Sequence, residues 1–547
     1  MKLSENIRQK LISIFKYIVF YWAIYLYTDI FGIVKWNTDQ LRMEVPFVIY
    51  LYFLSNGILR NDRFKPFLAA IPILMIYLIH DLYLFTFAET PRLIKVTELP
   101  ELISILEINH LLLSLFFIIP IGMFLIRFDK SKFKIFLLRS VPLCILIILM
   151  VYTPASLARS IHKNGTFYSW SEMKTLKKNG RIVLAVHYEA KRRLAYSRLS
   201  EHRDISKLSL KLPEGFLNNI NKRNVHVIIL ESFIDPRWFK NIQFDKSPAA
   251  ESFTLLFNNN VGSSISPVSG TSTSQAEFEI LCGVPAEGAI SGIEFNIFTG
   301  SKTYCLPGIL NEADYLTIAT NAWKPAYNSM TAYQGLGFDQ IFFPKEYVPQ
   351  NETYLRLDDT PKNLLFDGSL LRQNLDFISN KIREGQPVLN YVLGIYGHFN
   401  FKRDEEKRPS TIKTDNLIPE INRLVNQFYY RTKAIADYVN ELKMIDPDSL
   451  IIITADHIPP LNIGGDLYAK LGYMDNIEGA LYYTPLLVVQ NAEVIKYNKF
   501  NHFNIYRLVL DYVTDGGYCE KYDCNVDAEN KNIFHKDYLT ILGLASR

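Results

Sequence analysis

The sequence predicts a bundle of five membrane-spanning helices followed by a large α/β domain. Nearly all long apolar runs precede Pro154, in a 547-residue chain that is 49% hydrophobic overall. After Asn224 the pattern changes to a succession of apolar strands, polar loops and helices, which is typical of an α/β sheet. We therefore expect a transmembrane domain over residues 1–155, a juxtamembrane helical linker over 156–222 and a globular domain over 223–547.

The membrane half contains five segments that are candidates for crossing a bilayer, for which a helix needs about 20 residues. They are 12–34, 45–59, 66–88, 108–127 and 135–153. Basic residues gather at the N-terminus and in the connections after the second and fourth segments, which places these parts in the cytoplasm. These residues are Lys2, Arg8, Lys10, Arg60, Arg63, Lys65, Arg127, Lys130, Lys132 and Lys134. An odd number of spans then exports the globular domain.

Polar residues inside these segments have two interpretations. Asp29, His80, Asp81 and His110 could line a functional pathway, or they could lie near the ends of the spans or pair inside the bundle. The linker that follows is rich in basic and aromatic residues, with helical stretches near 170–200. We interpret it as a connector that lies on the anionic membrane surface.

The net charge of +4 comes without a basic stripe in the globular part, so the sequence does not indicate a nucleic-acid partner. The five cysteines indicate more about the compartment. Cys144 lies in an apolar run, whereas Cys282, Cys305, Cys519 and Cys524 lie in the globular part. An even number predicts two disulfides in an oxidising compartment, which agrees with export. The alternative is four unpaired buried thiols.

Three apolar runs of the globular part end in residues suited to metal or phosphate chemistry. The run 225–230 is followed by Glu231, the run 388–395 by His398, and the run 450–455 by Asp456 and His457. Ligands collect at the carboxyl ends of strands in such sheets. Two carboxylates and an imidazole suit Zn²⁺ or Mn²⁺, although each residue alone is more often a surface or capping residue.

A candidate nucleophile lies in the segment 269–278, just before a helical pattern that runs to Cys282. A hydroxyl at a helix N-terminus is close to free backbone N–H groups that can hold a phosphate, and a nearby metal would lower the pKa of that hydroxyl. The alternative is an ordinary helix cap, for which serine and threonine are preferred. The spacing alone does not choose between these interpretations.

At these residues the sequence resembles the alkaline phosphatase superfamily, in particular its membrane branch of lipoteichoic acid synthases, phosphoglycerol transferases and phosphoethanolamine transferases. The resemblance covers residues 224 to about 515. The motifs that carry it are Ile228-Ile229-Leu230-Glu231-Ser232, Thr273-Ser274-Gln275-Ala276-Glu277-Phe278, Cys282-Gly283-Val284-Pro285, Leu336-Gly337-Phe338-Asp339, Gly397-His398-Phe399 and Ala455-Asp456-His457. It implies an alkaline phosphatase-like (sulfatase-like) α/β catalytic domain behind the five-helix anchor.

The resemblance also implies roles for individual residues. Thr273, rather than Thr271, would be the nucleophile and a metal ligand. The coordination of one Mn²⁺ or Zn²⁺ ion would be completed by Glu231, Asp456 and His457. His398 would contact the transferred phosphate and move protons. Thr273 would attack a phospholipid head group, and the resulting phosphothreonine would pass the group to an acceptor hydroxyl.

The resemblance further implies a setting and partners. The chain would be a multi-pass protein of the bacterial cytoplasmic (inner) membrane with a periplasmic or otherwise extracytoplasmic catalytic domain. Its donor would be a membrane phospholipid, phosphatidylglycerol, and its acceptor a cell-envelope glycan or lipopolysaccharide. Cys282 and Cys305 resemble a cysteine pair of Gram-negative phosphoglycerol transferases and are expected to form one disulfide. Cys519 and Cys524 are close enough in the chain to form the other.

The head-group pocket departs from the family pattern. Lipoteichoic acid synthases have an arginine after an aromatic-Asn pair, whereas Tyr327-Asn328 is followed here by Ser329. Trp323, Tyr327 and Asn328 remain candidate pocket residues, with core packing as the alternative for the aromatic ones. A phosphoethanolamine transferase therefore remains an alternative to a phosphoglycerol transferase.

Two other functions are less well supported by the sequence. A sulfatase-like hydrolase needs a cysteine or serine in a motif with proline and arginine. The segment Cys305-Leu306-Pro307 begins in that way but lacks the arginine. A non-catalytic binding protein would not need Glu231, Thr273, Asp456 and His457, all of which are present.

Overall fold

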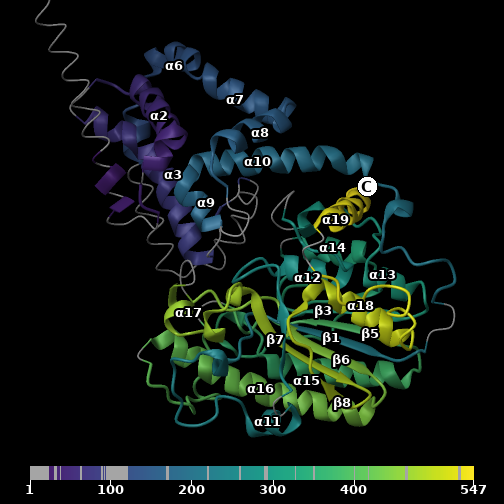
Figure 1. Cartoon of the computed structure of the whole chain (residues 1–547). Helices are drawn as coiled ribbons and strands as arrows, with labels where there is room; N and C mark the ends of the chain where they lie inside the picture. Colours follow the sequence, from purple (N-terminus) through teal and green to yellow (C-terminus); the bar gives the residue numbers. More distant parts are fainter. Residues whose placement is uncertain are drawn as a thin grey trace, which may run out of the picture. The chain divides into compact units, whose positions relative to one another are not determined.

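The structure is a computed structural model that covers two compact units, residues 1–197 and 198–547 (Figure 1). It describes residues 22, 24–26, 28, 29, 34–36, 38–61, 64–87, 90, 91, 93, 121–167, 172–217, 221–257, 260–288, 294–326, 328–348, 352–398, 401–416, 418–461, 466–527 and 531–547. The boundary between the two units falls within the segment 156–222, which the sequence presents as a linker.

The described part of the first unit is helical. Its helices are α2 (Glu44–Ile58), α3 (Lys65–Phe87), α6 (Phe133–Arg139), α7 (Val141–Tyr152), α8 (Pro154–Asn164), α9 (Glu172–Asn179) and α10 (Arg181–Arg198). The predicted segments 45–59 and 66–88 correspond to α2 and α3, and the helical stretches expected near 170–200 are α9 and α10. The predicted segments 12–34 and 108–127 lie largely outside the described residues.

The last predicted span, 135–153, is not one straight helix. Helices α6 and α7 meet at Ser140 with a bend of 48°. Pro142 lies in the first turn of α7, where a missing N–H is tolerated, but it cannot continue a helix that precedes it. Within the described residues, this bent pair has the length and apolar composition to cross a membrane, and no single helix does.

Polar residues of the first unit pair with one another. The Arg181 guanidinium donates to Asp81 through Nε at 2.7 Å and through Nη2 at 2.6 Å. Glu44 of α2 accepts hydrogen bonds from the backbone N–H groups of Arg181, Ile182 and Val183, and so caps the start of α10. Asp81 is therefore paired, but its partner belongs to the predicted linker 156–222 and not to the predicted spans.

The second unit is built on a mixed sheet, which confirms the α/β prediction. Its described residues form nine strands in the order β4-β3-β5-β1-β6-β7-β2-β9, with β8 paired to β7. The strands are β1 (Val225–Leu230), β2 (Gly262–Ile265), β3 (Leu316–Asn321), β4 (Gln340–Phe342), β5 (Val388–Leu393), β6 (Leu450–Ala455), β7 (Tyr483–Gln490), β8 (Glu493–Ile495) and β9 (Phe500–Asn501).

The central strands β5, β1 and β6 are parallel neighbours. Every residue of these three strands is buried, which explains why each reads in the sequence as a largely apolar run rather than an alternating one. The buried polar exceptions are His226, Asn390 and Thr454. Strand β7 then runs antiparallel to β6.

Helices cover both faces of the sheet (Figure 1). Helices α11 (Glu251–Phe257), α15 (Asp367–Arg383) and α16 (Pro419–Ile445) pack together on one face. The other face carries α12 (Thr273–Cys282), α13 (Leu306–Asn311), α14 (Ser329–Leu336), α18 (His502–Val513) and α19 (Lys531–Ala545). The short helix α17 (Asp466–Lys470) follows β6.

Helix α12 has sharply defined ends. It begins at Thr273, after Ser272 in a left-handed conformation, and it ends at Cys282. Gly283 takes φ = 71° at the C-terminal end, and a Cβ at this position would lie 2.7 Å from the ring of Tyr506. Glycine is therefore required here both by the backbone conformation and by the close packing of α18.

Candidate active site

The sheet topology brings three of the predicted residues together. Strands β1 and β6 are parallel neighbours in register, with Leu230 opposite Ala455. Glu231 directly follows β1, and Asp456 and His457 directly follow β6. The three side chains therefore leave the same edge of the sheet, where parallel strands present their carboxyl ends.

The three side chains form a compact buried cluster. One ligand atom from each of Glu231, Asp456 and His457 lies within 4.8 Å of the others. His457 Nε2 is 3.3 Å from Asp456 Oδ2 and 3.9 Å from Glu231 Oε1. Ligands of a tetrahedral ion with bonds of about 2.1 Å stand roughly 3.4 Å apart, so these separations are close to those of a metal site.

The electrostatics of the cluster favour a cation. Burial raises the pKa of Asp456 to about 6, and the nearby charge of Glu231 adds to this effect. Two carboxylates that share a buried site repel each other unless a positive charge lies between them. The Nδ1 atom of His457 is 2.9 Å from the carbonyl oxygen of Ile458. A proton on Nδ1 would be held there, which leaves Nε2 free to bind a metal ion. The residues thus fit a divalent cation.

Thr273 reaches the same cluster from the start of α12. It is the first residue of α12, and its Oγ1 donates to Asp456 Oδ2 at 2.7 Å and lies 3.5 Å from Glu231 Oε2. The N-cap of the helix is Ser272, which makes no capping hydrogen bond with its side chain. The hydroxyl of Thr273 therefore points to the two carboxylates instead of capping the helix.

His398 lies in the loop after β5, five residues beyond the end of that strand. Burial lowers its pKa to about 4, and the charge of His457 lowers it further, while Asp456 has the opposite effect. His398 is therefore neutral near pH 7 and able to accept a proton. Its place in the site stays a prediction.

The three candidate pocket residues are less closely tied to the site. The Trp323 ring packs against the hydrophobic core of α15 and α16 and lies 5.7 Å from the Tyr347 ring. Asn328 uses its side-chain amide to donate to the carbonyls of Phe295 and Phe298, both at 2.8 Å. Tyr327 lies outside the described residues. Their role in substrate binding stays a prediction.

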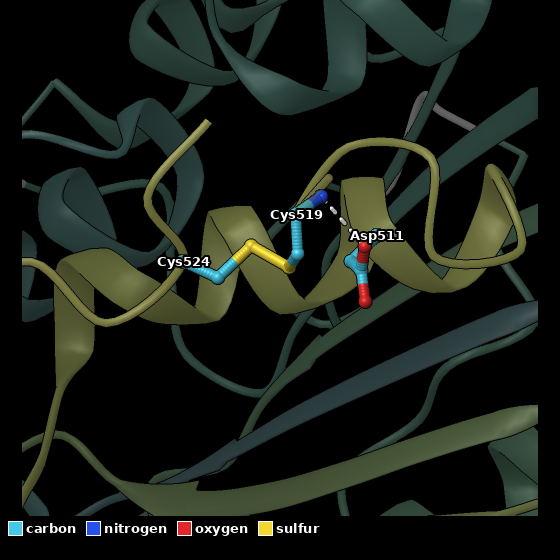
Figure 2. A group of neighbouring side chains, drawn as sticks. All are labelled: Asp511, Cys519 and Cys524. Atoms are coloured by element: carbon cyan, nitrogen blue, oxygen red, sulfur yellow. Dashed lines mark hydrogen bonds between the residues drawn. A yellow bond between two sulfur atoms is a disulfide. The ribbon is translucent and has the colours of Figure 1, made fainter. Parts of the chain in front are cut away.

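Both predicted disulfides are present. Cys282 at the end of α12 is bonded to Cys305, and Cys519 is bonded to Cys524. Figure 2 shows the second bond beside Asp511, whose Oδ1 accepts a 2.8 Å hydrogen bond from the Cys519 N–H. These three side chains also have the separations of metal ligands, but the two sulfur atoms are already bonded to each other.

Sequence reasoning missed the residues that support the cluster. Ser232 contacts both carboxylates, and Arg431 of α16 donates to the Glu231 carbonyl at 2.9 Å. Glu277 of α12 accepts hydrogen bonds from Tyr333 and Tyr391. The position of Ser232 next to Glu231 was a usable signal. Arg431 is 200 residues from its partner in the chain and gives no such signal.

Comparison with known proteins gives a curated relative and several solved structures with low sequence identity. A Rhizobium meliloti (strain 1021) protein named for modification of cyclic beta-1,2-glucan is 26% identical over 308 residues, or 52% of this chain. The match covers 44% of that relative, so this chain spans less than half of the relative's length.

The solved structures have TM-scores below 0.5. A lipoteichoic acid synthase, LtaP, from Listeria monocytogenes is 16% identical with a TM-score of 0.44, covering 63% of this chain and 81% of that one. The phosphoglycerol transferase GacH of Streptococcus pyogenes is 15% identical with a TM-score of 0.44, covering 71% of this chain and 92% of that one.

The family assignment comes from a different comparison. The family model described as "Sulfatase" matches residues 223–511. This region contains Glu231, Thr273, His398, Asp456 and His457, and it makes up more than half of the 547 residues. The chain therefore belongs to the sulfatase family, within the alkaline phosphatase superfamily that its sequence motifs indicate.

Proposed function

We propose that this protein transfers a phosphoglycerol group from a membrane phospholipid, phosphatidylglycerol, to a cell-envelope glycan through a phosphothreonine at Thr273. One observation carries the proposal. The Oγ1 of Thr273, at the N-terminus of α12, donates to Asp456 Oδ2 at 2.7 Å within the buried Glu231-Asp456-His457 cluster. A hydroxyl in this place is oriented for attack, and the free N–H groups of the helix favour a phosphate beside it.

The transfer takes two balanced steps. In the first, Thr273 Oγ1 bonds to phosphorus and the bond from phosphorus to the diacylglycerol oxygen breaks. The proton of the threonine hydroxyl leaves and diacylglycerol gains one. In the second, an acceptor hydroxyl attacks the same phosphorus, its proton is released, and Thr273 recovers a proton as its bond to phosphorus breaks.

The side chains around Thr273 have distinct tasks in these steps. Asp456 Oδ2 holds the hydroxyl hydrogen of Thr273 and thereby aims the oxygen lone pairs away from itself. His398, neutral at pH 7, accepts the proton of the acceptor hydroxyl. A Mn²⁺ or Zn²⁺ ion held by Glu231, Asp456, His457 and Thr273 would supply positive charge that lowers the pKa of the threonine hydroxyl and stabilises the phosphoryl oxygens.

The proposal includes a setting for the reaction. A lipid donor requires a site near a membrane, and the apolar helices of the first unit would supply the anchor. We place the protein in the bacterial inner membrane as a multi-pass protein with its catalytic domain in the periplasm, where the two disulfides can form. A glycan acceptor is supported by the relative named for glucan modification.

A phosphoethanolamine transferase that modifies lipopolysaccharide or a surface glycan is the second candidate. Ser329 stands where lipoteichoic acid synthases have an arginine, which leaves the head group open. A sulfatase-like hydrolase is disfavoured, because Cys305 is bonded to Cys282 and has no free thiol for maturation to formylglycine.

The decisive experiment combines a trapped intermediate with product analysis. Full-length protein incubated with phosphatidylglycerol vesicles and Mn²⁺ or Zn²⁺ should carry a glycerol phosphate adduct on Thr273, detected by mass spectrometry of its peptides. Envelope glycans from cells with and without the protein should differ by glycerol phosphate.

The neighbouring threonine provides the control. Thr273→Ala should abolish both the adduct and the glycan modification, whereas Thr271→Ala should keep the adduct on Thr273. A product with ethanolamine phosphate would replace the proposed donor by the second candidate. Full transfer by Thr273→Ala would overturn the mechanism.

A further inference from the structure

Ser232 connects the two carboxylates of the site, which come from different strands. Its backbone N–H donates to Asp456 Oδ1 at 2.8 Å, and its Oγ donates to Glu231 Oε1 at 2.7 Å. The residue is 3% exposed. One small side chain therefore fixes the position of Glu231 relative to Asp456.

The two oxygens of each carboxylate have different partners. One oxygen accepts hydrogen bonds from Ser232, and the other faces Thr273. Asp456 Oδ1 accepts from the N–H groups of Ser232 and His457, at 2.8 and 2.7 Å, while Oδ2 faces Thr273. Glu231 Oε1 accepts from Ser232, while Oε2 faces Thr273. The rotation of both carboxylates is thus set before any substrate arrives.

This arrangement depends on an unusual backbone. Ser232 has φ = 48°, in the left-handed region that a residue with a Cβ adopts only at a cost in free energy. The φ angle sets the direction of the Cβ relative to the N–H of the same residue, and in this conformation the N–H reaches Asp456 while Oγ reaches Glu231. With the N–H held on Asp456, an ordinary φ would turn Oγ away from Glu231 Oε1 and remove that hydrogen bond.

Arg431 holds this turn from the sheet face that carries α16. It is 2% exposed, and it donates through Nη2 to the Glu231 carbonyl at 2.9 Å and through Nε to Asp367 Oδ2 at 2.6 Å. The loop after β5 packs closely against the same Glu231 carbonyl and against Arg431. A Cβ at Gly397 would lie 1.8 Å from the Glu231 carbonyl oxygen and 2.6 Å from Arg431 Nη1.

We infer that Ser232 is a positioning residue of the metal site, and that the buried Arg431–Asp367 pair holds it in its left-handed conformation. The inference rests on the metal dependence within the proposed function and is independent of which group is transferred. Removing a side chain that orients a metal ligand typically weakens metal affinity by about 10- to 100-fold.

Metal affinity of the full-length protein, measured by calorimetric titration with Mn²⁺ and with Zn²⁺, is the primary test. Ser232→Ala removes the hydroxyl and should weaken binding by about 10- to 100-fold. Ser232→Gly also lacks the hydroxyl but relieves the backbone strain. It should bind metal as weakly as the alanine variant or more weakly, yet unfold at a higher temperature than that variant when no metal is present.

Ser379→Ala is the matched control. Ser379 is a buried serine in the C-terminal part of α15, the helix that begins at Asp367, and its Oγ donates to the Leu375 carbonyl. It should leave metal affinity unchanged. A merely structural role of Ser232 would lower the unfolding temperature without moving metal affinity.

The role of Arg431 is tested with two variants. Arg431→Lys keeps the charge but cannot reach Asp367 and the Glu231 carbonyl together, so metal affinity should fall. Because a single change could unpair a buried charge and prevent folding, the double variant Arg431→Met with Asp367→Asn removes both charges. It should fold and still bind metal more weakly than the wild type.

Wild-type metal affinity in Ser232→Ala would overturn the inference. If the wild type binds metal and Ser232→Ala does not, but no phosphoglycerol adduct forms on Thr273, the proposed function fails while the role of Ser232 stands. If the wild type binds neither metal, both are overturned.

Discussion

The Tyr391 hydroxyl donates a 2.8 Å hydrogen bond to Glu277 Oε1 and so joins the central strand β5 to the helix that begins at Thr273. Tyr333 of α14 donates to the same oxygen at 2.6 Å. Glu277 is fully enclosed and lies one helical turn after Thr273. Its carboxyl group therefore links α12 to two other elements of the domain.

Glu277 should make the stability of the protein depend on pH. Burial raises its pKa from 4.5 to about 7, with a further upward effect of Asp456. The folded state then holds the proton more tightly than the unfolded state. The free energy of unfolding should therefore decrease as pH rises from about 4.5 to 7, by about 3 kcal/mol if Glu277 acts alone.

The variant Glu277→Gln isolates this contribution. Its neutral amide should make the protein about as stable as the wild type at pH 4.5 and more stable at pH 8, as measured by denaturant unfolding in the presence of a chelator. Parallel stability curves of wild type and variant from pH 4.5 to 8 would contradict the prediction.

Metal removal should destabilise the catalytic domain. Without a cation, the carboxylates of Glu231 and Asp456 share a buried site, and the charge of Glu231 raises the pKa of Asp456. An ion at 100 times its dissociation constant should add about 2.7 kcal/mol to the free energy of unfolding. Thermal unfolding with Mn²⁺, with Zn²⁺ and with a chelator measures this shift.

Asp456→Asn is the control for that experiment. It removes one ligand charge and the repulsion with it, so the unfolding temperature should no longer respond to either ion. A shift in this variant as large as that of the wild type would mean that the ions bind elsewhere.

His398 should act as a base across the neutral range. Its pKa is lowered to about 4, first by burial, so the ring stays unprotonated down to mildly acidic pH. His398→Gln should lower kcat by about 10²- to 10⁴-fold. In the wild type, the part of the pH–rate profile that His398 governs should decline only near pH 4. A His398-dependent decline of the rate near pH 6.5 would contradict the lowered pKa of this residue.

The two disulfides should contribute unequally to stability. The Cys282–Cys305 bond closes a sequence separation of 23 and the Cys519–Cys524 bond one of 5. The chain-entropy model gives about 3 kcal/mol for the first and about 2 kcal/mol for the second. Paired alanine substitutions, compared by denaturant unfolding, should show this order. Cys144→Ala should change nothing, because Cys144 is exposed and unbonded.

The central strands could be predicted to within two residues because they are buried on both faces, which makes their runs largely apolar. The grouping of Glu231, Asp456 and His457 could be predicted from these strands, since neighbouring parallel strands end at the same edge of the sheet. Thr273 was ambiguous, because a first helical residue and an N-cap look alike in sequence. The structure separates them by placing Ser272 at the cap.

The supporting contacts were beyond sequence reasoning. Arg431 lies on the buried side of α16, where the apolar pattern of the helix predicts a core residue, and its partner Asp367 is 64 positions away. The pairing of Asp81 with Arg181 spans 100 positions. Such contacts depend on how elements pack, and neither periodicity nor spacing carries that information.

The disulfide at Cys282 fastens the far end of the helix whose first residue is Thr273. A helix of ten residues is stiff, so a shift of its last turn is passed on to its first. In a chain that has not yet been oxidised, the hydroxyl of Thr273 would thus be less well located. If the proposed function holds, the site would reach its final geometry only in an oxidising compartment, where Cys282 is paired.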